Sequence, residues 1–335
     1  MVRLITAVVL LTSLGSNLFG QSKTGTTVGQ FTLIDPSARS AAMGGAGVTS
    51  TSEAMGSYYN PGMLGTFGQS DVQFTYNAWF ADISLSHVLA AIHLGELGTA
   101  AISATQLSSG DIDVRTVEHP LGTGERYSVN DLLIGLGYGF KVTDRFSFGV
   151  MVNYVSERIW HSSTYNFGVN IGTLYQLSTD GLRIGASLVN FGTKNRYTGT
   201  DLKIRYDLDP TRYGDNSSIP GEVSTDDYSL PVVFRVGLGY PLKVDDSNTL
   251  NLAIDALHPS DNSESLNLGA EWAYRKVLAL RVGYQSLFQQ DSELGLTVGS
   301  GIAWDGLGYE LRFDYAWASH DRLGSVQRVT LSFAF

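Results

Sequence analysis

The sequence predicts an all-β protein, a transmembrane antiparallel β-barrel of about 14 strands with an N-terminal plug segment. Polar and apolar residues alternate with a period of two through almost the whole stretch from Asp71 to Phe335. Aromatic residues, which favour strands, make up 11% of the 335 residues. The connections between the expected strands are also alternately short and variable in length, as in a closed barrel.

Residues 1–20 predict a secretory signal peptide. Arg3 supplies a positive charge, and Leu4–Leu14 form an apolar stretch that is too short to span a bilayer as a helix. Small and polar residues follow, and we expect cleavage after Gly20. A short buried helix is the alternative. No later apolar run is long enough for a transmembrane helix, so we expect an exported protein whose destination is the cell outer membrane.

Residues 21–70 predict a plug segment, because they are rich in Gly, Ala and Ser and lack the alternation of a strand. Side chains of the wall alone cannot fill a barrel of this size. We therefore expect this segment to fold into the lumen from the periplasmic side. Gly44 and Gly45 allow tight turns, and Asn60-Pro61-Gly62 is typical of a turn. A phosphate-binding loop is disfavoured, because no strand precedes the glycines.

Residues 71–335 predict the outer-membrane barrel. In the stretch 146–154, one apolar face consists of Phe146, Phe148, Val150, Val152 and Tyr154. The expected strands begin near residues 71, 81, 97, 129, 145, 164, 181, 231, 249, 264, 278, 293, 308 and 326. A soluble sandwich also alternates, but these strands have the length of tilted outer-membrane strands. We expect an aromatic girdle near the strand ends that includes Trp79, Trp160, Trp272, Trp304 and Trp317.

The lengths of the connections predict the orientation of the barrel. Connections after even-numbered strands are short, whereas the two long ones, about 108–128 and about 192–230, follow odd-numbered strands. Barrels of this kind have short periplasmic turns and longer outer loops, so both chain ends should lie on the periplasmic side. The alternating "DIDVRTV" stretch (111–117) predicts an extra hairpin in the first loop. Both loops contain Tyr, Asp and Arg, which can bind a protein partner.

The final strand predicts a signal for the barrel assembly machinery. Val329, Leu331, Phe333 and Phe335 alternate up to a terminal Phe. We interpret Phe333 and Phe335 as the assembly signal, and an ordinary edge strand is the alternative. As an exposed edge in a soluble protein, this strand would promote aggregation.

The charged residues exclude some functions. The formal net charge of −10 argues against a nucleic-acid partner, and the absence of Cys excludes disulfides and thiolate metal sites. We expect a lumen charge network of mixed sign that holds the plug, whereas an ion-selective pathway would show one dominant sign. The expected inward-facing charges are Arg183, Arg235, Asp255, Glu271, Arg281, Glu310, Arg312, Asp314 and Arg328.

Histidines at the expected outer edge are candidates for catalytic or metal-binding residues. His119, His161, His258 and His320 fall there, and Asp261 and Asp321 are close in sequence to two of them. An acid–His pair could activate water. However, no ordered Ser/His/Asp or metal-ligand spacing appears. We therefore predict no catalytic residues, no metal site, no cofactor and no enzymatic activity.

The segment "DPSARSAAMGGAGVTSTSEAMGSYYNPGML" resembles the N-terminal signature of the PorV/PorQ family, which belongs to the wider FadL-like barrels. The matching plug-motif residues are Arg39, Met43, Gly44, Gly45, Asn60 and Pro61. Gly62 departs from the pattern, where Ala is usual. The resemblance continues through residues 79–84, 144–150, 182–192, 255–271 and 280–288.

This resemblance implies a 14-stranded barrel with an N-terminal plug that acts in type IX secretion. It implies that outer loops bind the C-terminal signal domains of secreted cargo, and that the barrel docks on translocon proteins. The other expected partner is outer-membrane lipid. The resemblance is compatible with a PorV-like shuttle, a PorQ-like attachment component or a paralogue with another task, and the sequence does not distinguish these three. The alternative function is a FadL-like transporter of hydrophobic small molecules, which needs an apolar tunnel past Asn60.

Overall fold

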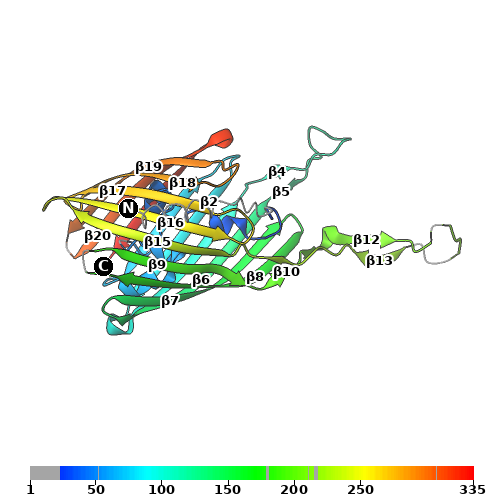
Figure 1. The fold of residues 1–335 in the computed structure, drawn as a ribbon. Coiled ribbons are helices and arrows are strands. Elements are labelled where there is room, and N and C mark those ends of the chain that lie inside the picture. Colours follow the sequence, from blue (N-terminus) through cyan, green and yellow to red (C-terminus); the bar gives the residue numbers. More distant parts are fainter. Residues whose placement is uncertain (1–22, 52, 179–180, 210, 215–217, 307) are drawn as a thin grey trace, which may run out of the picture.

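The computed structural model describes residues 23–51, 53–178, 181–209, 211–214, 218–306 and 308–335, and the expected signal peptide lies outside these residues. Within the described chain, fourteen long strands form one closed antiparallel barrel (Figure 1). They are β1(Asp71–Ala78), β2(Ser84–His93), β3(Thr99–Ser108), β6(Val129–Thr143), β7(Phe146–Ile159), β8(Ser162–Gln176), β9(Arg183–Gly192), β15(Val233–Lys243), β16(Asn248–Pro259), β17(Ser265–Tyr274), β18(Leu278–Leu287), β19(Leu294–Gly306), β20(Tyr309–His320) and β21(Gly324–Ala334).

The barrel closes between its first and last strands. β1 pairs with β2 on one side and with β21 on the other, and Asp71 faces Ala334 in that closing register. Phe335 continues the ladder, since its N–H and carbonyl both bond the backbone of Ser70 at 2.9 Å. Each strand begins within three residues of its predicted start. The prediction of a 14-stranded barrel is therefore confirmed.

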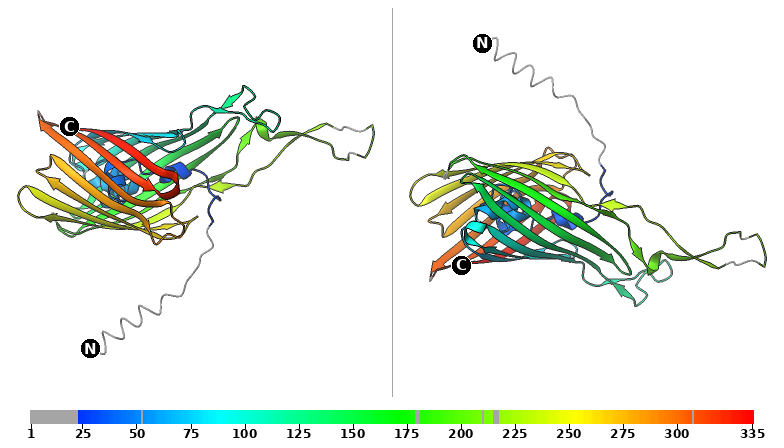
Figure 2. Two further views of the ribbon diagram at one scale, coloured as in Figure 1. Left: turned by 90° about the horizontal axis from the view of Figure 1, so that it is seen from above. Right: turned by 90° about the horizontal axis from the view of Figure 1, so that it is seen from below.

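The two ends of the barrel differ. We call the end with the short turns, such as residues 94–98 with η3(Gly95–Leu97), the inner end, and the opposite end the outer end. At the outer end, β4(Ile112–Asp113) pairs with β5(Arg126–Tyr127) between β3 and β6. A second long connection joins β9 to β15 and contains β10(Lys194–Asn195), β11(Thr198–Gly199), η4(Thr200–Leu202), β12(Lys203–Tyr206), β13(Ile219–Glu222) and β14(Tyr228–Ser229). Figures 1 and 2 show β12 and β13 as an arm that extends well beyond the barrel.

The barrel wall has an apolar outer face and a polar inner face. In β1, the even-numbered residues Val72, Phe74 and Tyr76 are exposed, whereas the odd-numbered residues are buried. An exposed apolar band of this kind suits contact with lipid. Trp272 and Trp304 are exposed near the inner end, as a girdle requires.

The sequence suggested that Trp79 belongs to an outward-facing aromatic girdle, but this side chain does not point outward. It lies in the turn between β1 and β2, and its ring is covered by the guanidinium of Arg328 at 5.7 Å and by the ring of His320 at 5.1 Å. Both of these groups come from the wall near the outer end, and Trp79 lines a cavity there. The polar partners available inside the barrel explain why this indole turns away from lipid.

The segment before β1 runs along the inside of the wall. It contains η1(Gln30–Leu33), α2(Ala38–Ala42), α3(Gly56–Tyr59) and η2(Pro61–Thr66), and most of its residues are buried. We call residues 27–66 the luminal segment; Figure 2 shows it, in blue, within the barrel. No helix of the described chain is long and apolar enough to cross a membrane.

The luminal segment starts at the outer end, not at the inner end from which we expected it to enter. The N–H of Val28 donates to the carbonyl of Ser229 at 3.0 Å, and the hydroxyl of Thr27 donates to Asp261 at 2.6 Å. Both partners belong to outer connections. The segment then runs toward the inner end, where Ser70 pairs with Phe335.

Candidate functional site

Arg39 connects the luminal segment to the wall. It lies in the short helix α2, whose first turn is capped by the hydroxyl of Ser37, which accepts from the N–H of Ser40 at 3.1 Å. The Arg39 guanidinium forms a two-pronged ion pair with Glu271 of β17, with N–O distances of 2.8 and 2.6 Å. Both side chains are buried, and the pair lies beside a luminal cavity of about 350 Å³ that Arg281 and Asp314 also line.

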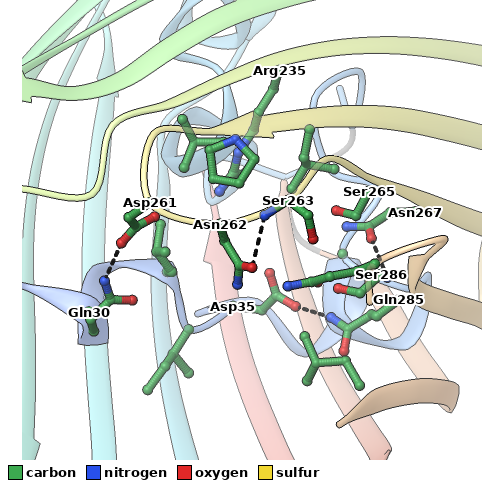
Figure 3. A pocket seen from close by; sticks show the side chains of 18 of the residues that line it. Gln30, Asp35, Arg235, Asp261, Asn262, Ser263, Ser265, Asn267, Gln285 and Ser286 are labelled. Carbon is green, nitrogen blue, oxygen red and sulfur yellow. Dashed lines mark hydrogen bonds between the residues drawn. The ribbon is translucent and has the colours of Figure 1, made fainter. Parts of the chain in front are cut away.

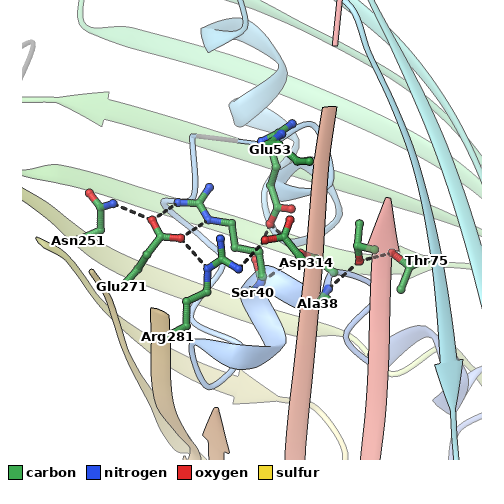
Figure 4. A network of polar contacts seen from close by, with 12 residues as sticks. Ala38, Ser40, Glu53, Thr75, Asn251, Glu271, Arg281 and Asp314 are labelled. Carbon is green, nitrogen blue, oxygen red and sulfur yellow. Dashed lines mark hydrogen bonds and ion pairs between the residues drawn. The ribbon is translucent and has the colours of Figure 1, made fainter. Parts of the chain in front are cut away.

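The same carboxylate is shared by a second arginine. Arg281 of β18 donates to Glu271 at 2.6 Å and to Asp314 of β20 at 2.5 Å (Figure 4). The amide of Asn251 completes the contacts of Glu271 at 2.8 Å. Four alternating charges, Arg39, Glu271, Arg281 and Asp314, therefore join α2 to three wall strands. Such a network satisfies buried charges that would otherwise be costly.

A second group of charges lies closer to the inner end. Arg312 of β20 pairs with Asp71 at 3.0 Å and with Glu310 at 3.4 Å. Asp71 in turn accepts from the N–H of Ala54, at 3.2 Å, and from Gln73. This group therefore also contacts the luminal segment, at the point where the segment approaches β1.

Asn60 and Pro61 lie against the opposite side of the wall. The Asn60 amide donates to the carbonyls of Val48 and Thr173 at 3.0 and 2.9 Å, and its oxygen caps η2 by accepting from the N–H of Gly62. The contact with the wall is close: a Cβ on Gly149 of β7 would lie 2.1 Å from the Pro61 carbonyl oxygen. Only glycine at that wall position leaves room for the turn.

Met43, Gly44 and Gly45 follow α2 in the same close-packed manner. Gly44 and Gly45 have positive φ angles of 68° and 70°. A Cβ on Gly283 of β18 would lie 2.1 Å from the Gly44 nitrogen, and that N–H donates to the hydroxyl of Thr297 at 3.0 Å. The run of small residues in the sequence is thus matched by glycines in the wall.

The remaining predicted charges do not join the network around Glu271. Asp255 accepts from the N–H of Val48 at 2.8 Å, and Arg183 lines a small cavity beside the luminal segment. Arg235 lies with its guanidinium 5.5 Å from the ring centre of Tyr59. The predicted lumen charges therefore divide into several separate contacts.

The sequence reasoning missed two acids of the luminal segment. Glu53 is fully buried and accepts from the hydroxyls of Ser37 and Ser40 at 2.7 and 3.0 Å. Asp35 accepts from the amide of Gln285 at 2.5 Å. These two are the only acids between residues 24 and 70. An isolated acid in a stretch with so few charges could have indicated a buried polar contact.

The predicted assembly signal lies on the outside of the barrel. Phe333 stacks on Tyr309 with ring centres 5.3 Å apart, and Phe335 lies 5.5 Å from Phe333. Both rings are exposed near the inner end.

Two of the outer histidines form exposed pairs with acids, whereas His320 is buried. His161 lies 2.9 Å from Asp201, and His258 lies 3.0 Å from Glu264. Asp261, which is close to His258 in sequence, instead contacts the luminal segment. Over the described residues, no three His, Asp or Glu side chains group as metal ligands.

The base of the long outer connection is fixed to the barrel mouth. The hydroxyl of Tyr197 donates to Glu157 of β7 at 2.7 Å, and Leu230 is buried in a cluster with Val28 and Phe31. Burial and this hydrogen bond to a carboxylate raise the pKa of Tyr197 above its usual value. The arm formed by β12 and β13 therefore projects from a rigid base.

Above the luminal segment, a cavity of about 300 Å³ opens toward the outer end (Figure 3). We call it the outer cavity. Its floor includes Ile34 and Asp35, and its rim includes Asp261, Asn262 and Ser263 of the connection between β16 and β17.

The comparison with protein families decides the identity. A model described as type IX secretion system protein PorV matches residues 19–207, which is more than half of the chain. The chain belongs to the PorV family. Its closed barrel is an outer-membrane barrel, and the resemblance noted in the sequence is confirmed. No curated protein matches the chain.

Solved structures share the fold of this PorV-family barrel. The Pseudomonas putida toluene transporter TodX matches with a TM-score of 0.56 at 14% identity, over 88% of this chain and 96% of that chain. A Pseudomonas aeruginosa FadL homologue matches with a TM-score of 0.53 at 12% identity, over 88% and 96%. The Ralstonia pickettii toluene transporter TbuX matches with a TM-score of 0.54 at 14% identity, also over 88% and 96%. At these identities the likeness extends to the FadL-like fold alone.

Proposed function

We propose that this protein is a non-enzymatic component of type IX secretion that binds exported cargo or translocon proteins through its outer loops. Membership in the PorV family supports the secretion role. The observation that carries the proposal is the arm formed by β12 and β13, which extends beyond the barrel (Figure 2). The arm presents exposed apolar side chains.

The arm has two chemically different faces. In its register, Tyr206 lies opposite Ile219 and Ile204 lies opposite Gly221, so these side chains share one face. Lys203 and Arg205 alternate with them and share the other face. All three apolar side chains are exposed. An isolated two-stranded ribbon is at best marginally stable in water, so a partner that covers the apolar face would stabilise the arm.

We further propose that the luminal segment acts as the plug and that the network of Arg39, Glu271, Arg281 and Asp314 holds it. A lumen occupied by this segment supports binding at the loops over passage through the barrel. The alternative, a FadL-like transporter of hydrophobic molecules, needs an apolar tunnel past Asn60. Asn60 is fully buried, and its amide is occupied by two carbonyls. This geometry favours the secretion function.

The test is affinity capture from detergent-solubilised outer membranes, with a tag inserted after Glu118 in the other long loop. We expect recovery of exported proteins that share a C-terminal signal domain, or of translocon proteins. I204S/Y206S should lose these partners, whereas the matched variant K203S/R205S on the opposite face should keep them. Recovery of the barrel alone with hydrophobic ligands would favour the transporter. Equal capture by both variants would contradict the assignment to the apolar face.

A further inference from the structure

The outer cavity contains two buried arginines without a hydrogen-bond or ion-pair partner in the described chain. Arg328 of β21 is 2% exposed, and its Nε and one terminal nitrogen, Nη1, make no hydrogen bond. Arg235 of β15 is 7% exposed, and its Nε likewise makes none. Their guanidinium carbons lie 5.7 and 5.5 Å from the ring centres of Trp79 and Tyr59, respectively. An aromatic face does not replace an acceptor, so these buried N–H groups are left without one.

The acids of the outer cavity are occupied by other groups. Asp35 accepts from the amide of Gln285 at 2.5 Å, and Asp261 accepts from Thr27 and Gln30 at 2.6 Å each. Neither acid lies within ion-pair distance of the two arginines, and the remaining titratable group that lines the cavity is His320. The buried cationic N–H groups are therefore not matched by the carboxylates that share their cavity.

The outer cavity also contains two buried atoms suited to accept a hydrogen bond. The Oε1 of Gln285 has no partner, whereas its amide nitrogen donates to Asp35. The Nε2 of His320 has none either, and its Nδ1 lies 3.4 Å from the carbonyl of Ala318. Since a carbonyl only accepts, the proton belongs on Nδ1, and Nε2 is then an acceptor.

These observations define a ligand with complementary groups. We propose that the outer cavity binds a small organic anion that carries one carboxylate and at least one hydroxyl or amide N–H. The carboxylate would accept from Arg235 and Arg328, which suit it as planar multiple donors. The hydroxyl or amide would donate to Gln285 and His320. The volume of about 300 Å³ is at the lower end of the range for small-molecule sites.

The lining of the cavity combines polar groups with a larger share of apolar surface. Its polar residues include Asn262, Asn267 and Ser286 (Figure 3). Leu33, Ile34 and Leu257 contribute apolar surface. The required chemistry has two sources: a free hydroxy acid such as a sugar acid, or the terminal carboxylate of a peptide. The inference goes beyond the proposed secretion role and does not depend on it.

The experiment is isothermal titration calorimetry on the purified full-length mature protein in detergent. The probes are galacturonate and N-acetyl-dialanine, and the neutral controls are galactose and N-acetyl-dialaninamide. We expect at least one acid to bind at least tenfold more tightly than its neutral control. R235Q and R328Q should each weaken that binding at least tenfold. R183Q removes a luminal arginine that lines a different cavity, and it should retain affinity within about twofold.

The variants need a control for folding, because both arginines are buried. The gel shift that folded barrels show before heating reports folding, and R235K and R328K supply charge-conserving second variants. Binding of galacturonate alone would assign the site to free acids, and binding of the peptide alone would assign it to chain ends. Failure of both acids to bind, equal binding of the neutral controls, or equal weakening by R183Q would overturn the proposal and leave a cavity that holds only water.

Discussion

Replacing Gly283 by Ala should detach the luminal segment from the wall next to Gly44. The added Cβ would lie 2.1 Å from the Gly44 nitrogen and 2.3 Å from the Met43 carbonyl carbon, whereas ordinary contacts begin at 3.4 Å. The segment must therefore retreat by more than an ångström. Both neighbours are backbone atoms, so no flexible side chain can move aside instead.

The size of this effect follows from what the displacement breaks. Overpacking costs about 1–3 kcal/mol, and the hydrogen bond from the Gly44 N–H to Thr297 contributes about 1 kcal/mol, so the local cost is about 2–4 kcal/mol. Local opening should then become about 30- to 700-fold more frequent, because each 1.4 kcal/mol is a factor of ten.

Hydrogen exchange measured by mass spectrometry tests this prediction. Peptides that cover residues 39–47 should lose protection by that factor in G283A, while peptides from β6 and β7 keep theirs. G295A is the matched control, because a Cβ at Gly295 meets no atom closer than 4.0 Å. Unchanged protection at residues 39–47 in a folded G283A barrel would refute the reasoning.

Three further predictions concern other contacts. Changing Glu271 to Gln breaks two buried ion pairs and should lower the free energy of unfolding by about 3–5 kcal/mol, measured by urea titration in lipid vesicles. Y197F removes the hydrogen bond to Glu157, about 1–3 kcal/mol, and should speed limited proteolysis in residues 193–232 without changing the thermal stability of the barrel. Hydrogen bonds from Arg322 hold the pKa of Glu293 below its usual value. That contact should therefore stay intact while the pH falls through the usual glutamate range, and it should disappear only as the pH falls through the lowered pKa. The NMR chemical shift of the Arg322 amide measures this loss.

Each of these predictions has a contradicting result. Unfolding of E271Q at the wild-type urea concentration would mean that the buried network contributes little. Wild-type proteolysis of Y197F would mean that other contacts fix the base of the arm. A midpoint at or above the ordinary glutamate value for the Arg322 shift would contradict the contact between these two outer connections.

The barrel was predictable because its physical signal is local. A strand with one face toward lipid must alternate between apolar and polar residues. Positions such as Val72, Phe74 and Tyr76 were therefore enough to predict their strand. The parity of the connections then followed from closure. The inward charges could also be named, because they occupy the other phase of the same alternation. Trp79 was misplaced, because the partners that turn it inward, Arg328 and His320, come from strands more than 200 residues away.

The luminal segment was harder to predict for a physical reason. Its small residues pack against a surface that distant strands form. Its own sequence therefore lacks a periodic pattern from which its path through the barrel could be predicted. Gly44 fits against Gly283, and Pro61 fits against Gly149. The direction of the segment depends on the hydrogen bond from Thr27 to Asp261 at the outer end, between residues far apart in the sequence. Nor could the separation of Arg235 from the network around Glu271 be read from the sequence, because both lie on inward faces.

Site-specific photo-cross-linking in living cells tests the central claim most directly. A photoreactive amino acid replaces Tyr206 on the apolar face of the arm, and for comparison it replaces Val117, which is fully exposed in the other outer loop. We expect cross-links from position 206 to exported proteins with a shared C-terminal domain, or to translocon proteins. Cross-links to these proteins from position 117 alone, or from neither position, would contradict the claim that the arm binds secretion partners.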